Sequence, residues 1–400
     1  MKMSDFSTSE FYTNPYPTYA RLRAEGELVP LAPKIWASGR HATIECILKD
    51  RRMGRAYLEG VRLRYGEERA KADVFQTFSR MMLLINPPEH TRIRGLLMRA
   101  FNAAQMEKFN AITQEIAEEL FDRQASSGGM DVMKDYAIPL SLRIICKLLD
   151  VPYRDVAMFS EAVHALAFTF ELAPMSDAQI TAANAAAHRL EHYFLEILRE
   201  RRKKPSDDLI SLLLLVEENG TRLTDDEIVA NIVMLFFAGH ETTSHMIGNA
   251  LIALHRHPTE LAKVLRNEYT LYEVVYECLR YDGSVQLTGR AALEDMEIGG
   301  THVAKGDMVY VFLGSANHDP DAFDHAGQLR LAKDVHKPKL LTFGGGIHHC
   351  IGARLAWIEI ETALKVLIER APQLEILGID RLEWHRRNTL RGVESLRVAW

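Results

Sequence analysis

The sequence predicts a mainly α fold of the α+β type, with a large helical lobe and a smaller sheet-rich lobe. Apolar residues recur at helical spacing through most of residues 90–280. Breaks rich in Gly, Pro and Ser, such as 126–129 and 203–208, are too short to be interdomain linkers. The strand-like stretches lie toward the two ends of the chain, at 28–36, 296–302, 308–312 and 395–400. We therefore expect residues 1–400 to form a single domain.

The composition restricts the class of protein. Hydrophobic residues make up 47% and charged residues 26% of the 400 residues, which is ordinary for a soluble globular protein. The net charge of −6 argues against a nucleic-acid partner. The cysteines are far apart and form no C-x-x-C pair: Cys46, Cys146, Cys278 and Cys350. This spacing indicates a reducing compartment and argues against a disulfide framework or a four-cysteine zinc site.

No targeting or membrane segment is evident in the sequence. The N-terminus lacks the apolar core of a signal peptide. The longest apolar run, at 228–239, is too short to span a bilayer. We expect a cytoplasmic protein without a membrane partner.

A long buried helix is predicted to begin after Thr224. Thr224 and Glu227 have the spacing of a capping box, and apolar residues continue to Pro258, where a helix must stop. Such a helix has about 32 residues and is about 48 Å long. Its middle reads AGHETT, at 238–243, where a glycine and a buried acid are both costly. From this stretch alone, a packing glycine beside a satisfied polar pair and a functional site are equally open.

The stretch FGGGIHHCIG, at 343–352, places Cys350 in a glycine-rich turn ahead of a predicted helix. A buried core cysteine does not need four glycines, which allow positive φ and close approach of the backbone to a bulky group. The helix N-terminus favours a thiolate. A nucleophilic cysteine would need a histidine base, and the adjacent His349 points elsewhere in most turns. Zinc would need more soft ligands, and the glycine spacing is not that of a dinucleotide site. The remaining interpretation is that Cys350 is the axial thiolate ligand of a haem.

This loop resembles the haem-binding loop of the cytochrome P450 family. The shared pattern is F-G-x-G-x-H-x-C-x-G, formed by Phe343, Gly344, Gly346, His348, Cys350 and Gly352. The resemblance extends over nearly the whole chain and also rests on 14–23, 86–101, 238–243 and 277–280. It is closest to the soluble bacterial class, among enzymes that tailor polyketides and other secondary metabolites. It implies a single P450-like fold around a buried haem and a monooxygenase that hydroxylates or epoxidises its substrate with one atom of O2.

The resemblance also implies roles for individual residues. Cys350 would be the axial ligand of haem b, and Ala238 and Gly239 would leave room above the iron. Glu241 and Thr242 would be the acid–alcohol pair that passes protons. The haem propionates would be held by His90, Arg94, Arg290 and His348, and the other cofactor-binding residues of the loop would be Phe343, Gly344 and Gly352.

A buried structural pair is implied at Glu277 and Arg280, although two residues three apart on a helix can also be an ordinary surface pair. The sequence departs from the family downstream, where 323–329 reads FDHAGQL. Ala326 replaces a proline and Gln328 replaces an arginine. Gln328 can hydrogen-bond but carries no charge, so whether it completes the network is open.

Electrons must reach a P450 singly, and this sequence contains neither a flavin domain nor an iron–sulfur cysteine set. The implied partners are a separate ferredoxin and its NAD(P)H-dependent reductase, with the chain itself a monomer. Ferredoxins are acidic, so candidates for a basic docking face are Arg99, Lys339 and Arg354. Their interpretation as solvated surface charges is equally open.

The sequence gives less information on the substrate than on the cofactor or the reaction. By resemblance, its contacts fall in 74–85, 165–180 and at Met234, Phe237, Val285, Leu287 and Leu390. These positions are mostly apolar, which favours a medium-sized, largely apolar substrate, either free or bound to a carrier protein. The six arginines in 51–71 suit a carboxylate or a carrier protein, but a solvated helix face is favoured. The alternatives are a fatty-acid or terpenoid hydroxylase, a haem-thiolate peroxygenase, a non-catalytic haem-binding protein, and a fold relic that recruits another enzyme.

Overall fold

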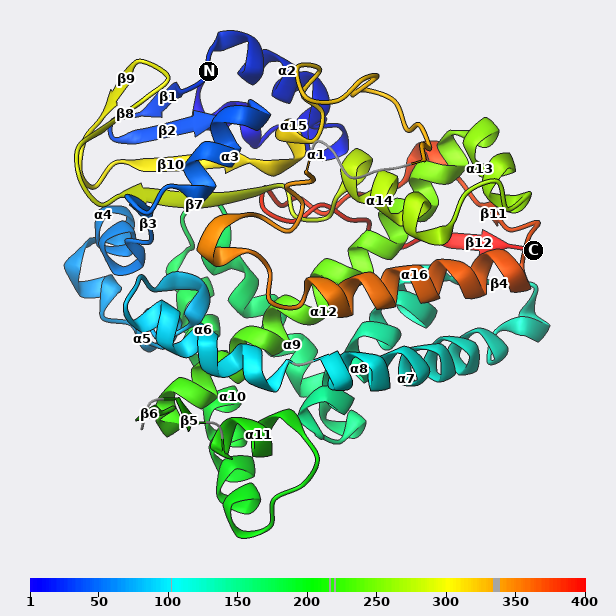
Figure 1. The fold of residues 1–400 in the computed structure, drawn as a ribbon, viewed down its shortest axis with the longest axis horizontal. Helices are drawn as coiled ribbons and strands as arrows, with labels where there is room; N and C mark the ends of the chain where they lie inside the picture. Colours follow the sequence, from blue (N-terminus) through cyan, green and yellow to red (C-terminus); the bar gives the residue numbers. More distant parts are fainter. Residues whose placement is uncertain (102, 216, 219–220, 334–338) are drawn as a thin grey trace. The chain divides into compact units, whose positions relative to one another are not determined.

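The computed structural model describes residues 1–101, 103–215, 217–218, 221–333 and 339–400 (Figure 1). The chain divides into two compact units. The sheet-containing unit comprises Met1–Met53, Lys108–Ser141 and Glu241–Trp400, and the helical unit comprises Gly54–Glu107 and Leu142–His240. The mainly α fold with small sheets is confirmed. The expectation of a single domain stays a prediction.

Three helices belong to both units because a unit boundary falls inside each of them. They are α7 (Ala103–Asp122), α8 (Ile138–Leu149) and α12 (Asp225–Arg256). The other helices of the helical unit are α4 (Tyr57–Ala70), α5 (Asp73–Phe78), α6 (Glu89–Ala100), α9 (Val156–Ala167), α10 (Asp177–Lys203) and α11 (Leu209–Leu215). Those of the sheet-containing unit are α1 (Ser9–Thr13), α2 (Tyr16–Glu25), α3 (His41–Lys49), α13 (Pro258–Leu265), α14 (Leu271–Asp282), α15 (Leu313–Ala316) and α16 (Ala353–Arg370).

The largest sheet has five strands in the order β1-β2-β10-β7-β3 (Figure 1). Its strands are β1 (Val29–Ala32), β2 (Ile35–Ser38), β10 (Met308–Phe312), β7 (Leu287–Ala292) and β3 (Met53–Gly54). Strand β10 pairs in parallel with β2 and antiparallel with β7, where Val309 lies opposite Arg290. Apolar side chains of α3, β10 and α15, including Ile44, Val311 and Leu313, share one buried cluster. The central strand therefore holds β7, and with it Arg290, in a fixed register.

The strand-like stretches expected at 296–302 and 395–400 lie in smaller sheets, the first as two strands joined by a turn. Strands β8 (Met296–Ile298) and β9 (Thr301–Val303) form a hairpin. Strand β12 (Arg397–Ala399) pairs with β11 (Glu375–Ile376) and β4 (Gly129–Asp131), and β5 (Glu217–Glu218) pairs with β6 (Thr221–Arg222). No helix in the described part of the chain combines the length and the apolar character needed to cross a bilayer.

The long helix α12 follows the predicted capping signals. The Thr224 backbone N–H donates to Glu227 Oε2 at 2.8 Å, and the Glu227 N–H donates to Thr224 Oγ1 at 3.2 Å. The helix runs for 32 residues and ends before Pro258, which opens α13. Both the start and the end of α12 are thus fixed by local chemistry.

Candidate active site

The loop that carries Cys350 depends on glycine at two positions. Gly344 and Gly346 have φ of +69° and +63°, which side chains disfavour, and a Cβ on Gly346 would overlap the Leu48 carbonyl oxygen. The Cys350 N–H donates to the Phe343 carbonyl at 3.0 Å and closes the loop. The positive φ is as the sequence predicts, and the glycines also let the loop fold tightly against α3.

Cys350 is exposed and lies three residues before α16 begins at Ala353. This excludes the interpretation of Cys350 as an ordinary core cysteine. Cys146 and Cys278, by contrast, are buried, and burial raises the pKa of the Cys146 thiol to about 12 and raises that of Cys278 further. Of these thiols, only that of Cys350 lies at a helix N-terminus, where the helix dipole favours a thiolate.

Arg290 on β7 is a buried cation of the sheet-containing unit. Its residue surface is 2% exposed, and its Nη1 donates to the Gly289 carbonyl at 3.0 Å. No carboxylate of the described residues forms an ion pair with it. Burial lowers the pKa of this guanidinium to about 10. A buried charge without a counter-charge is costly, so this position fits an anionic group that the protein binds.

The other candidate anion-binding residues lie in two places. His90 is buried and Arg94 is half-buried, one turn apart on α6 of the helical unit. His348 is half-buried at the end of a short 3-10 turn, Gly346–His348, in the Cys350 loop. The role of these residues as propionate donors stays a prediction.

The middle of α12 differs from the rest of the helix in its exposure. From position 228 to position 254 every residue is buried except five: Phe237, Ala238, Gly239, Glu241 and Thr242. A Cβ on Gly239 would come within 3.4 Å of Ile145 Cδ1, so the small residue here allows tight packing on that side. The partly exposed residues coincide with the predicted AGHETT site, which favours a functional interpretation over packing alone.

Glu241 and Thr242 are each held by a residue from elsewhere in the sheet-containing unit. Arg387 Nη1 donates to Glu241 Oε2 at 3.0 Å, with both side chains largely buried. The Ser284 hydroxyl donates to the Thr242 carbonyl at 2.7 Å. Sequence reasoning missed Arg387, which is 146 positions from Glu241 and belongs to no recognisable motif. The proton-passing role of the acid–alcohol pair stays a prediction.

Glu277 and Arg280 form a buried pair, as the resemblance implied. Arg280 Nε and Nη2 donate to the two oxygens of Glu277 at 2.8 and 2.7 Å. The remaining donors of Arg280 reach the backbone carbonyls of Asn317, Ala326 and Gln328. The Gln328 side chain is exposed, so the residue contributes its carbonyl rather than its amide group. Main-chain oxygens therefore complete this network.

The predicted substrate residues fall into two groups, one in each unit. In the helical unit, Phe237 stacks on Phe170 with ring centroids 5.0 Å apart, and Phe78 lies 5.4 Å from Phe170. Met234 is buried one turn before Phe237. In the sheet-containing unit, Val285 and Leu390 form an antiparallel bridge near the buried Leu287 of β7. Both groups are apolar, as expected, and their contact with a substrate stays a prediction.

The surface charges singled out in the sequence are exposed. Arg99, Lys339 and Arg354 all face solvent, which agrees with a docking role and with plain solvation alike. In the arginine-rich stretch, Arg69 pairs with Asp177, and Arg64 donates to the Glu171 carbonyl. These contacts support a structural use of that stretch.

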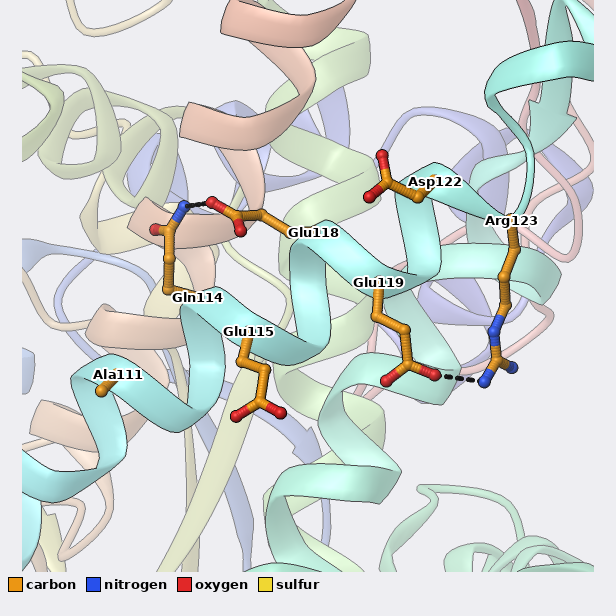
Figure 2. A pocket seen from close by; sticks show the side chains of 7 residues that line it. All are labelled: Ala111, Gln114, Glu115, Glu118, Glu119, Asp122 and Arg123. Atoms are coloured by element: carbon orange, nitrogen blue, oxygen red, sulfur yellow. Dashed lines mark hydrogen bonds and ion pairs between the residues drawn. The ribbon is translucent and has the colours of Figure 1, made fainter.

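A surface hollow on α7 contains none of the predicted site residues (Figure 2). Figure 2 shows carboxylates spaced along one helix, with Glu118 accepting from Gln114 and Glu119 paired with Arg123. Such short-range pairs are usual on a solvated helix face.

Comparison with known proteins identifies the family. A family model described as "Cytochrome P450" matches residues 64–371. A putative cytochrome P450 133B2 of Xylella fastidiosa is 44% identical over 396 residues, which cover 99% of each chain. The vitamin D(3) 25-hydroxylase of Pseudonocardia autotrophica is 33% identical over 99% of this chain and 96% of its own. The chain belongs to the cytochrome P450 family.

A solved structure shows the same fold. P450BioI, in complex with an acyl carrier protein ligated to hexadec-9Z-enoic acid, superposes with a TM-score of 0.90 at 31% identity. The match covers 98% of this chain and 100% of that one. The protein is accordingly a haem-dependent monooxygenase that receives electrons from NAD(P)H through partner proteins.

Proposed function

We propose that the protein inserts one oxygen atom into a medium-sized, largely apolar substrate, a polyketide or other secondary metabolite, with Cys350 as the thiolate ligand of haem b. The observation that carries the ligand assignment is an exposed cysteine in a loop built on two positive-φ glycines at the N-terminus of α16. When bound, the haem supplies the iron for the overall reaction RH + O2 + 2 e⁻ + 2 H⁺ → ROH + H2O.

Arg290 and His348 would hold the haem propionates, together with His90 and Arg94. The buried guanidinium of Arg290 fits this role best because no described carboxylate pairs with it. A propionate would supply the missing counter-charge and accept charge-assisted hydrogen bonds. Phe343, Gly344 and Gly352 would shape the loop that binds the cofactor, and the small residues Ala238 and Gly239 would leave room for oxygen.

Glu241 and Thr242 would deliver protons to the oxygen that leaves as water. Both belong to the five partly exposed positions at the centre of α12. The Glu241 carboxylate can exchange protons with water, and the Thr242 hydroxyl can donate a hydrogen bond at a fixed position. Peroxygenase chemistry would not need this pair.

The substrate class rests on the apolar side chains and on the relatives. The aromatic cluster of Phe78, Phe170 and Phe237, in which Phe170 stacks on Phe237, favours a flat or extended apolar group. The similarity to P450BioI favours a second candidate, hydroxylation of a fatty acyl chain, free or on a carrier protein. Electrons would come from a ferredoxin and its reductase, docking on exposed basic residues such as Lys339 and Arg354.

The absorption spectrum of the reduced, carbon-monoxide-bound protein tests the ligand. A Soret band with the red shift typical of thiolate ligation is expected, and a band without it would refute the assignment of Cys350. A panel of hexadec-9Z-enoic acid, vitamin D3 and a macrolide, each added to the ferric protein, then tests the substrate class. The compound that displaces the iron-bound water and yields product with a surrogate ferredoxin and reductase identifies the class.

A further inference from the structure

Arg387 forms an ion pair with Glu241 but has been given no role in the site described above. The two side chains are 12% and 17% exposed, and the Arg387 Nη1 to Glu241 Oε2 distance is 3.0 Å. An exposed pair of this kind contributes little, but a largely buried one fixes the geometry of both groups. Here the fixed group is the acid of the proposed proton-delivery pair.

Arg387 belongs to a hairpin, residues 384–393, which we call the C-terminal hairpin. Trp384 bridges to Val393, and the His385 N–H donates to the Gly392 carbonyl at 3.0 Å. The hairpin is also tied to the chain after α14, because the Gln286 N–H donates to the Thr389 carbonyl at 2.9 Å. Arg387 therefore extends from a segment with a defined backbone.

The base of this hairpin is anchored by a second buried arginine. Arg391 Nε donates to Asp282 Oδ1 at 2.7 Å, and its guanidinium lies 3.5 Å from the centre of the Trp384 ring. The Arg391 N–H donates to the carbonyl of Ser284 at 2.7 Å. Ser284 is the residue whose hydroxyl donates to the Thr242 carbonyl. One connected set of contacts thus holds both members of the acid–alcohol pair.

We propose that Arg387 is a positioning residue for proton delivery: it holds the Glu241 carboxylate in one orientation relative to Thr242. This inference rests on the proposed role of Glu241. Arg387 touches neither the cofactor nor the substrate in this role and acts only through Glu241. If Arg387 served stability alone, its removal would lower the unfolding temperature and leave the yields of product and peroxide per NAD(P)H unchanged.

Two histidines near this pair must keep a constant charge during the test. His245 lies one turn after Glu241 on α12, and its ring is 4.9 Å from that of His385 in the hairpin. His385 also lies 4.0 Å from Glu394. Assays at one pH above the range in which histidine ordinarily titrates avoid a change in these charges.

The variants are R387M, R387K, E241Q and the double variant R387M/E241Q, with R386M as the matched control. Arg386 is the adjacent arginine of the same hairpin and is exposed. NAD(P)H consumed, peroxide released and product formed are measured with the panel compound that gives the most product. We expect R387M to lower product per NAD(P)H about tenfold and to raise the peroxide released. The effect should be smaller than the full rate contribution of a general acid, because Arg387 only positions that acid. R387K should recover at least half of the loss, and R386M should behave like the parent protein.

The double variant shows whether Arg387 acts through Glu241 or has an effect of its own. R387M/E241Q should couple no worse than E241Q, because Arg387 acts through Glu241. Thermal unfolding of the haem-loaded proteins gives a readout without turnover, in which the losses caused by R387M and E241Q should be non-additive. If E241Q uncouples while R387M does not, the role of Arg387 is wrong and the proposed function stands. If E241Q itself couples like the parent protein, both this inference and the proposed role of Glu241 are wrong.

Discussion

Replacing Arg280 with methionine should destabilise the protein far more than the loss of an ordinary ion pair. Arg280 makes two hydrogen bonds to Glu277, at 2.8 and 2.7 Å, and three to the backbone carbonyls of Asn317, Ala326 and Gln328, at 3.0, 2.8 and 2.6 Å. The side chains of the pair are only 5% and 7% exposed, so water cannot replace these bonds without a rearrangement.

The magnitude follows from what remains after the substitution. Glu277 keeps one donor, the Arg330 N–H at 2.7 Å, and otherwise becomes a buried carboxylate without a cation. Removing one partner of a buried pair costs about 3–5 kcal/mol, and methionine fills part of the vacated volume. We therefore expect R280M to lower the free energy of unfolding by about 4 kcal/mol.

Urea titration of the haem-loaded protein, followed by circular dichroism, measures this loss. The control is R123M, which breaks the exposed pair between Glu119 of α7 and Arg123, just after the helix, and should cost about 0.5 kcal/mol or less (Figure 2). R280K keeps a charge but cannot serve all five acceptors, so it should fall between the two. A loss below about 1 kcal/mol in R280M would show that the pair is not the support inferred from its burial.

Four further outcomes are expected. C350S should fold but bind little haem, measured as haem per polypeptide, because a hydroxyl is a far weaker iron ligand than a thiolate. R290M should lose haem to apomyoglobin about tenfold faster, because a charge-assisted hydrogen bond is removed. T242A should bind substrate normally yet release more peroxide and less product per NAD(P)H, since the positioned hydroxyl is gone. Burial raises the pKa of Glu359 to about 8 from its ordinary value of 4.5. Between these values the folded state holds one more proton than the unfolded state, so stability should fall by about 1.4 kcal/mol per pH unit as pH rises. E359Q should remove that slope in unfolding measured from pH 5 to pH 8.

The parts of the fold that the sequence predicts are those fixed by neighbouring residues. Thr224 and Glu227 predict the start of α12, and Pro258 predicts its end, because capping hydrogen bonds and the missing N–H of proline act within one turn. The Cys350 loop could be predicted for the same reason, since Cys350 and the positive-φ glycines Gly344 and Gly346 lie within ten residues. Structural features set by nearby residues can therefore be predicted from a short stretch of sequence.

The network around Arg280 could not be completed from the sequence for a different reason. The replacement of an arginine by Gln328 suggests a lost interaction, yet the backbone carbonyl of Gln328 accepts from Arg280. Every residue carries such a carbonyl, so no residue type signals its use. Only the path of the chain through 317–328 shows that three carbonyls converge on one guanidinium.

The proposed proton-delivery pair lies in a stretch that the sequence predicts, but the contacts that hold it could not be predicted. Glu241 and Thr242 stand in a recognisable stretch of α12, but the contacts that hold them come from Ser284 and Arg387, far along the chain. Because neither contact involves the Cys350 loop, we predict that substitution of Arg387 changes the proposed proton delivery more than it changes haem retention. Two P450s with the same AGHETT stretch and the same cysteine loop can therefore differ in how many electrons they lose to peroxide. The residue at position 387, rather than the stretch itself, would account for that difference.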